Sequence, residues 1–186
     1  MAERGEVATV LAPAEVGRAL ADVLAGLAAP EEGELRVAGG TGRVALVPPG
    51  GALLPDMTVA DNLALGLTVR SAADLRARVE VSARLLQVDG ALDLHPDRLS
   101  AAQQLRAGMA RALTARPGLV VVEDRAGGPP CGPAVAAAAD RVAVLVVTDD
   151  LSRVRPVLDR RWTAVEVGPH RHRHRHLRGR GGGGGG

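Results

Sequence analysis

Residues 100–124 read SAAQQLRAGMARALTARPGLVVVED, and this stretch contains the patterns that decide the fold. The segment Ser100-Ala-Ala-Gln103 is a capping box, and it predicts an amphipathic helix that stops before Pro117, because proline disfavours helix in the residue before it. A continuous apolar run, Leu119–Val122, follows and ends in Glu123-Asp124. A strand that is apolar at every position is typical of a parallel sheet with both faces covered by helices.

The other predicted elements repeat this alternation of strands and helices. Short apolar runs predict further strands at residues 5–11, 34–37, 44–47, 142–147 and 162–167. Apolar residues at helical spacing from Val16 to Leu27 predict a helix after the first strand. Residues 53–87 are interpreted as helical, with a helix cap at Ser71. We therefore predict an α/β fold of P-loop NTPase-like type, a mostly parallel sheet flanked by helices, with an inserted helical subdomain at about 53–116.

The composition limits both the core and the chemistry. The chain has 186 residues, of which 46% are hydrophobic, and this fits one globular domain. It has neither Phe nor Tyr and a single Trp, so the core must be built from Leu, Val and Ala. Lysine is absent, which excludes any reaction that needs a lysine amine. The single cysteine, Cys131, excludes an intramolecular disulfide and a thiolate zinc site.

The charge is unevenly distributed between the body of the chain and its end. The formal net charge is +2, but five arginines follow Gly168, and without them 18 basic residues face 21 acidic ones. The body therefore has no general nucleic-acid footprint, and no nucleic-acid partner is expected. The longest apolar run, Val142–Val147, is far shorter than the roughly 18 residues of a membrane span, and the acidic start does not resemble a secretion signal. We expect a cytoplasmic protein.

Residues 169–186 form a tail of low complexity. Histidine and arginine alternate from His170 to His176, and the chain ends in six glycines. In an extended chain the imidazoles would share one side and could hold a divalent metal weakly. We interpret the tail as disordered, with no metal site, because such a composition cannot bury a core.

The order of several segments carries a family resemblance. They are Gly5-Glu6-Val7, Leu24-Ala25-Gly26-Leu27, Gly33–Val37, Ala52–Leu63, Leu99–Gln103, Ala110–Pro117 and Thr148-Asp149-Asp150. This series resembles the nucleotide-binding domain of ATP-binding-cassette (ABC) transporters across residues 1–168. The resemblance implies a cytosolic ATPase that uses ATP and magnesium, dimerises head to tail, and works with a membrane permease or with a second ATPase subunit.

The resemblance also assigns the phosphate-binding loop to residues 12–19, where the family pattern is GxxxxGK followed by Ser or Thr. Gly17 matches the last glycine, and Arg18 takes the lysine position. Glu15 places a carboxylate where phosphate is expected, and Ala19 has no hydroxyl for a metal. Arginine keeps the charge but lacks the compact shape of an ammonium group. These residues predict weak phosphate binding at best, and a plain strand-to-helix turn is the other interpretation.

The signature segment, expected as LSGGQ, reads Leu99-Ser100-Ala-Ala-Gln103. Ser100 and Gln103 are candidates for contact with a nucleotide phosphate across a dimer, or they are only a helix cap. Both alternatives stay open from the sequence.

The catalytic carboxylates implied by the family are Glu123 and Asp124, in the reverse of the family order. Pro49 stands where a glutamine is expected, and Asp149 where a histidine should contact the γ-phosphate. We therefore predict a degenerate ABC-type subunit that hydrolyses ATP weakly or not at all. Two alternatives remain: an active ATPase whose composite sites borrow groups from a heteromeric partner, and a non-enzymatic binding module that acts through the Arg/His tail.

Overall fold

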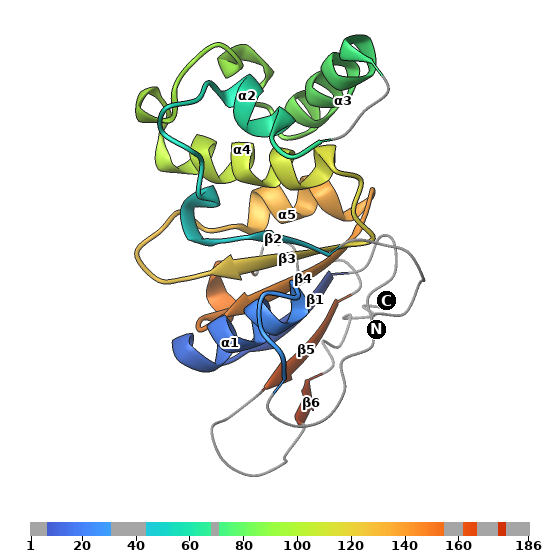
Figure 1. Cartoon of the computed structure of the whole chain (residues 1–186). Coiled ribbons are helices and arrows are strands. Elements are labelled where there is room, and N and C mark those ends of the chain that lie inside the picture. Colours follow the sequence, from blue (N-terminus) through green and yellow to red (C-terminus); the bar gives the residue numbers. More distant parts are fainter. Residues whose placement is uncertain (1–6, 31–43, 68–70, 155–161, 167–174, 178–186) are drawn as a thin grey trace, which may run out of the picture.

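The computed structural model describes residues 7–30, 44–67, 71–154, 162–166 and 175–177, in which strands and helices alternate (Figure 1). The strands are β1 (Val7–Leu11), β2 (Val44–Val47), β3 (Leu119–Asp124), β4 (Ala143–Thr148), β5 (Trp162–Glu166) and β6 (Arg175–Leu177). They form one sheet in the order β2-β3-β4-β1-β5-β6. The first five are parallel to their neighbours, and β6 is antiparallel to β5. The predicted mostly parallel sheet is confirmed.

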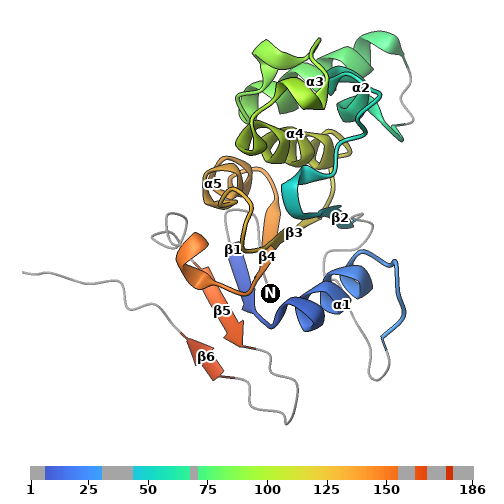
Figure 2. The ribbon, with the colours of Figure 1, turned by 90° about the vertical axis from the view of Figure 1, so that its left-hand side faces the viewer.

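Helices cover both faces of this sheet. The α-helices are α1 (Ala14–Leu24), α2 (Val59–Ala64), α3 (Ala72–Leu85), α4 (Ala101–Thr114) and α5 (Gly132–Ala139). Single 3₁₀ turns are η1 (Pro49–Gly51), η2 (Asp89–Ala91), η3 (Pro96–Arg98) and η4 (Leu151–Arg153). Helix α1 lies on one face and α4 and α5 lie on the other, with α2 and α3 stacked beyond α4 (Figures 1 and 2). None of the described helices is both long and apolar enough to cross a bilayer.

The core consists of two layers, because successive side chains of a strand point to opposite faces. On the α1 side, Val121 of β3 and Val147 of β4 pack with Ala21 and Leu24 of α1. On the other side, the neighbouring strand residues pack against α4 and α5; this layer includes Val120, Val122, Val144, Val146, Met109 and Val135. The valine runs are therefore buried on both faces, as the sequence predicts.

The helical prediction for residues 53–87 is wrong for the first part of that range. Helix α2 begins only at Val59, and Thr58 caps it by accepting a hydrogen bond from the Asp61 amide. The buried Asn62 side chain fixes the irregular loop before the helix: its Oδ1 accepts from the Leu54 amide at 2.8 Å, and its Nδ2 donates to the Leu54 carbonyl at 3.1 Å. These bonds replace the helical ladder in the loop. The predicted cap at Ser71 is confirmed, since its Oγ accepts from the Asp74 amide.

Two sequence expectations fall wholly or mostly on residues that the structure does not describe. The predicted strand at 34–37 lies outside the described residues. Of the tail at 169–186, only residues 175–177 are described, and they form the short strand β6; that the tail is disordered stays a prediction.

The turn after β2 is held directly against α4. A Cβ on Gly51 would lie 2.4 Å from the Gln104 carbonyl oxygen, and a Cβ on Gly108 would lie 2.4 Å from the Gly51 Cα. Gly51 also has φ +84°, a left-handed conformation that favours glycine. Arg111 of α4 then donates to the Gly51 and Ala52 carbonyls, each at 2.9 Å. Only glycines at positions 51 and 108 allow this backbone-to-backbone contact.

Candidate functional site

The predicted catalytic residues lie where the carboxyl ends of β1, β3 and β4 meet. Glu123 and Asp124 are the last two residues of β3, which pairs with β4 up to Thr148. Arg18 reaches this edge from α1, which directly follows β1. In open parallel sheets this edge is where ligands bind. The structure therefore places Arg18 beside Glu123, with Asp124 as the next residue of β3.

The connection from β1 to α1 is only two residues long. Strand β1 ends at Leu11, and α1 begins at Ala14 with Pro13 as its N-cap residue. The Gly17 amide already donates to the Pro13 carbonyl at 2.9 Å inside the helix. Pro13 has no amide hydrogen to offer a ligand. The segment at 12–19, assigned by resemblance to a phosphate loop, is thus helical from its third residue.

Gly17 is buried and allows close packing of α1 on the rest of the site. A Cβ at this position would lie 2.8 Å from Cγ1 of Val147 and 3.0 Å from the guanidinium nitrogens of Arg125. A contact under 3.0 Å forces the neighbouring atoms to shift. Gly17 therefore makes room for Arg125 beside the end of β3.

Glu123 lies between two arginines and is only 2% exposed. Its Oε2 is 3.5 Å from Nη2 of Arg125, and its Oε1 is 3.9 Å from Nε of Arg18. Burial raises the pKa of Glu123 above its ordinary value, although the positive charges of Arg18 and Arg125 oppose this change. Within the described part of the chain, Glu123 Oε1 and both terminal nitrogens of Arg125 have no hydrogen-bond partner. Oε1 of Glu123 is therefore held by charge alone, 3.9 Å from the Arg18 guanidinium.

Asp124 has a different arginine and is fully hydrogen-bonded. Arg153, from η4, donates Nε to Oδ2 at 2.6 Å and Nη2 to Oδ1 at 3.2 Å. The Cys131 amide donates to Oδ1 at 3.2 Å, and the Thr148 hydroxyl donates to Oδ2 at 3.3 Å. The hydrogen bonds to Asp124 raise the pKa of Arg153 above its usual value. Both oxygens of the Asp124 carboxylate are thus engaged within the chain.

Arg153 also fixes the loop that follows β3. Its Nη2 donates to the Gly128 carbonyl at 3.0 Å and to the Pro129 carbonyl at 3.3 Å. Burial, and then the neighbouring Asp124 carboxylate, raise the pKa of the Cys131 thiol well above its ordinary range. A thiol that stays protonated is a poor nucleophile and a poor metal ligand.

Sequence reasoning missed Arg125 and Arg153, which neutralise the acidic pair. Arg125 could have been suspected, because it directly follows two carboxylates at the end of a buried strand. Arg153 lies 29 residues from Asp124 in the sequence, and no local signal joins them.

The acidic corner after β4 is a local turn. The Thr148 hydroxyl accepts from the Asp150 amide at 3.1 Å, and the Asp150 carboxylate accepts from the Ser152 amide at 2.8 Å. The bonds from Ser152 lower the pKa of Asp150. Asp149, at the position of the family histidine, is exposed. Asp150 therefore caps η4.

Ser100 and Gln103 form the predicted capping box at the start of α4. The Ser100 amide donates to Oε1 of Gln103 at 2.9 Å, and the Gln103 amide donates to Oγ of Ser100 at 3.3 Å. No hydrogen bond or ion pair joins either side chain to the described residues around Glu123. The cap interpretation is confirmed, and a contact with a phosphate on another chain stays a prediction.

Over the described ranges, no three His, Cys, Asp or Glu side chains gather as a set of metal ligands.

Comparisons with known proteins place this geometry in context. No protein-family model matches the chain. Curated proteins that match include the spermidine/putrescine import ATP-binding protein PotA of Methylococcus capsulatus, 35% identical over 64% of this chain and 34% of its own length. The sulfate/thiosulfate import ATP-binding protein CysA 2 of Chromobacterium violaceum is 35% identical over 65% of this chain and 36% of its own length. The glucose import ATP-binding protein GlcV of Saccharolobus solfataricus is 33% identical over 66% of this chain and 39% of its own length. The chain thus spans little more than a third of the length of these relatives.

Solved structures cover more of the chain. The dimeric ABC transporter cassette MJ0796 superimposes with a TM-score of 0.73 at 20% identity, covering 96% of this chain and 88% of that one. A dimeric post-hydrolysis state of the same cassette, bound to ADP and Pi, gives a TM-score of 0.72 at 19% identity, with the same coverage of both chains. At such identities the likeness establishes the fold, which is that of an ABC cassette.

Proposed function

Because this chain is a homologue of the ATP-binding subunits of ABC transporters and has the fold of their cassette domain, we propose that it is a degenerate cassette subunit. In this proposal it hydrolyses ATP weakly or not at all. It associates at the inner face of the membrane with an ABC permease or with an intact ABC ATPase subunit.

The observation that carries the proposal is the internal pairing of the acidic residues at the end of β3. Magnesium prefers carboxylate and water oxygens that are free to complete an octahedral shell. Here Asp124 binds the Arg153 guanidinium through both oxygens. Glu123 is flanked by Arg18 and Arg125. A magnesium ion beside these two carboxylates would be repelled by the guanidinium groups that already pair with them. The residues present do not fit magnesium.

The start of α1 supports the same proposal for ATP. A phosphate loop binds by wrapping several free backbone amides around the phosphate oxygens. In this chain α1 follows β1 after Ala12 and Pro13 alone, and Pro13 has no amide hydrogen. The exposed carboxylate of Glu15 lies in the first turn of the helix, where it repels a phosphate group. This short connection and the Glu15 carboxylate support the proposal that the chain binds a triphosphate weakly or not at all.

The test compares the purified chain with its own double variant Glu123→Gln/Asp124→Asn. ATP turnover and calorimetric binding of ATP are measured with and without magnesium, beside an intact ABC ATPase as positive control. We expect no turnover above that of the double variant and no magnesium-dependent increase in affinity. Turnover that needs magnesium and disappears in the double variant would overturn the proposal. Turnover that arises only when a partner ATPase is added would favour the composite-site alternative, and this result also counts against a non-hydrolysing subunit.

A further inference from the structure

A pocket lies at the opposite edge of the sheet from the acidic pair. It has a volume of about 720 Å³ and lies between α3, the end of α4 and the start of β4. Arg116 and Pro117 line it just before β3 begins, and Arg141 and Val142 line it just before β4 begins. Strand β3 has six residues, so this edge is roughly 15–20 Å from the acidic pair. The pocket is thus separate from the site at the end of β3.

The charge of this pocket is strongly positive. Four arginines line it (Arg78, Arg84, Arg116 and Arg141), against one carboxylate, that of Asp74. Asp74 is already paired with Arg78 at 3.0 Å, and Arg84 is paired with Glu80 at 2.7 Å. In the part of the chain that is described, the side chains of Arg116 and Arg141 have no ion pair or hydrogen bond. Among the described residues, the guanidinium groups of Arg116 and Arg141 beside this pocket are therefore unpaired.

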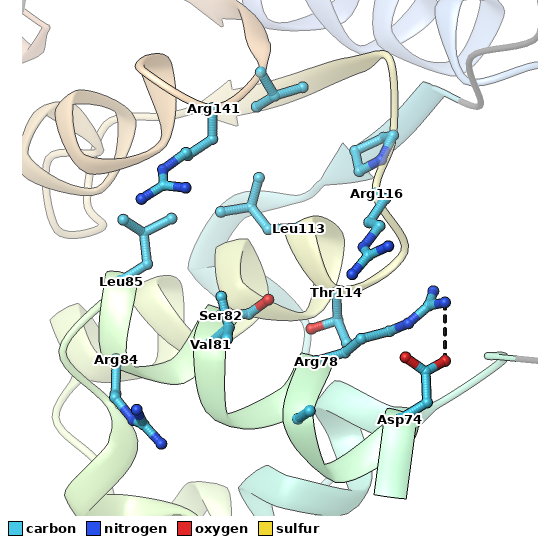
Figure 3. Close-up of a pocket in the computed structure, with 13 residues that line it drawn as sticks. Asp74, Arg78, Val81, Ser82, Arg84, Leu85, Leu113, Thr114, Arg116 and Arg141 are labelled. Atoms are coloured by element: carbon cyan, nitrogen blue, oxygen red, sulfur yellow. Dashed lines mark ion pairs between the residues drawn. The ribbon is translucent and has the colours of Figure 1, made fainter. Parts of the chain in front are cut away.

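The side chains are arranged around an apolar floor (Figure 3). Arg78 and Arg116 extend toward the same side of the view, Arg141 lies on the other side near Leu85, and Arg84 points away. Apolar side chains line the space between them, among them Val81, Leu85, Leu113 and Val142. The buried Ser82 also lines the pocket, so its hydroxyl is available there as a donor.

Two features show that these arginines are held at a cost. The Nε of Arg78 is buried and has no hydrogen-bond partner in the described chain. Arg116 has φ +52°, the left-handed conformation at the residue after the α4 C-cap, where glycine is the favoured residue. Arginine at this position directs a guanidinium group to the pocket, which glycine cannot do.

We propose that this arginine pocket, defined by Arg78, Arg116 and Arg141 over the floor of Leu85 and Leu113, binds a small organic anion. The ligand carries a phosphate or a carboxylate group on an apolar body. Guanidinium groups recognise both kinds of oxyanion through paired N–H donors, and a pocket of this volume accommodates a small molecule.

The test uses calorimetric titration of the purified chain with phenyl phosphate, with benzoate, and with phenol as the uncharged control. Removing a charge-assisted hydrogen bond costs at least tenfold in affinity. We expect saturable binding of at least one anion, little binding of phenol, and at least a tenfold loss of affinity in Arg116→Gly. The matched control is Arg76→Gln, which removes an exposed arginine of α3 outside the pocket and should leave the affinity unchanged.

The Arg116→Gly variant also separates binding from folding. Glycine adopts φ +52° without strain, so the unfolding midpoint should stay equal or rise while anion binding is lost. Phenyl phosphate and benzoate distinguish a phosphate ligand from a carboxylate ligand. The proposal is overturned if neither anion binds saturably up to about 10 mM, if phenol binds as tightly, or if Arg76→Gln loses as much affinity as Arg116→Gly.

Discussion

The Arg153 guanidinium donates two hydrogen bonds to the Asp124 carboxylate, from Nε to Oδ2 at 2.6 Å and from Nη2 to Oδ1 at 3.2 Å. Asp124 is 3% exposed, so this is a buried ion pair with additional bonds from Cys131 and Thr148. A carboxylate at the end of a parallel strand is commonly a ligand for metal or substrate. In this chain it serves as an anchor for the loop that follows β3.

The pairing predicts a large loss of stability in Arg153→Met. The change leaves the Asp124 charge buried without its cation, which costs about 3–5 kcal/mol of unfolding free energy. Urea denaturation followed by circular dichroism measures this loss. The control is Arg98→Met, because Arg98 and its partner Asp97 are largely exposed, and its loss should be below about 1 kcal/mol. Similar losses in the two variants would show that the Arg153 pair is not buried in solution.

Because Glu123 is buried, its contribution to the free energy of unfolding should fall as the pH rises. An ordinary paired carboxylate has the opposite pH dependence. Burial raises its pKa in the folded state, so folding favours the protonated form. This contribution to stability is fully present below the unfolded-state pKa, near 4.5, and is lost as the pH rises through the folded-state value. Relative to Glu123→Gln, the wild-type chain should therefore lose stability as the pH rises above 4.5. Chemical denaturation of both proteins across this window measures the difference, and a difference that grows in the other direction would contradict the assigned shift.

The contact between the turn after β2 and α4 predicts that Gly108→Ala is destabilising. Alanine is the better helix former by about 1 kcal/mol, but its Cβ would lie 2.4 Å from the Gly51 Cα. We expect the clash to dominate, with a net loss of about 1–3 kcal/mol. Gly90→Ala is the matched control, because a Cβ there meets no atom within 4 Å. Thermal unfolding of both variants decides the point, and a stabilised Gly108→Ala would refute the close contact.

Ser100 and Ser71 cap their helices in the same way, so removing either hydroxyl should lower the stability of the chain by a similar amount. Each serine accepts a hydrogen bond from the amide three residues later, at 3.3 Å and 3.1 Å respectively. Loss of an N-cap hydroxyl costs about 1 kcal/mol. Ser100→Ala and Ser71→Ala should therefore lower the unfolding free energy by similar amounts. If Ser100→Ala alone also reduces the ATPase of an assembled transporter, Ser100 contacts a phosphate in addition to its role as a cap.

The elements of this fold could be predicted wherever a local pattern defines them. The valine run of β3 and the capping box of α4 each contain their own signal, and both are present in the structure. The loop before α2 could not be predicted, because one buried side chain, Asn62, satisfies its backbone from several residues away. Such a bond outweighs the helical pattern of the surrounding residues.

At the site, the sequence and the family resemblance located the acidic pair but not its partners. Arg18 and Glu123 come together because helix α1 begins, and strand β3 ends, at the same edge of a parallel sheet. Arg153 and Asp124 meet only through the three-dimensional course of the chain after β4. Two residues so far apart in the sequence produce no periodicity or capping pattern from which their contact could be predicted.

The glycine contact of Gly51 with Gly108 has a mechanical consequence. With no side chain between them and with Arg111 bridging to the carbonyls of Gly51 and Ala52, the two backbones cannot slide past each other. We therefore expect α4 and the end of β2 to move together as one unit. A hinge between the helical layer and the sheet would have to lie outside this joint.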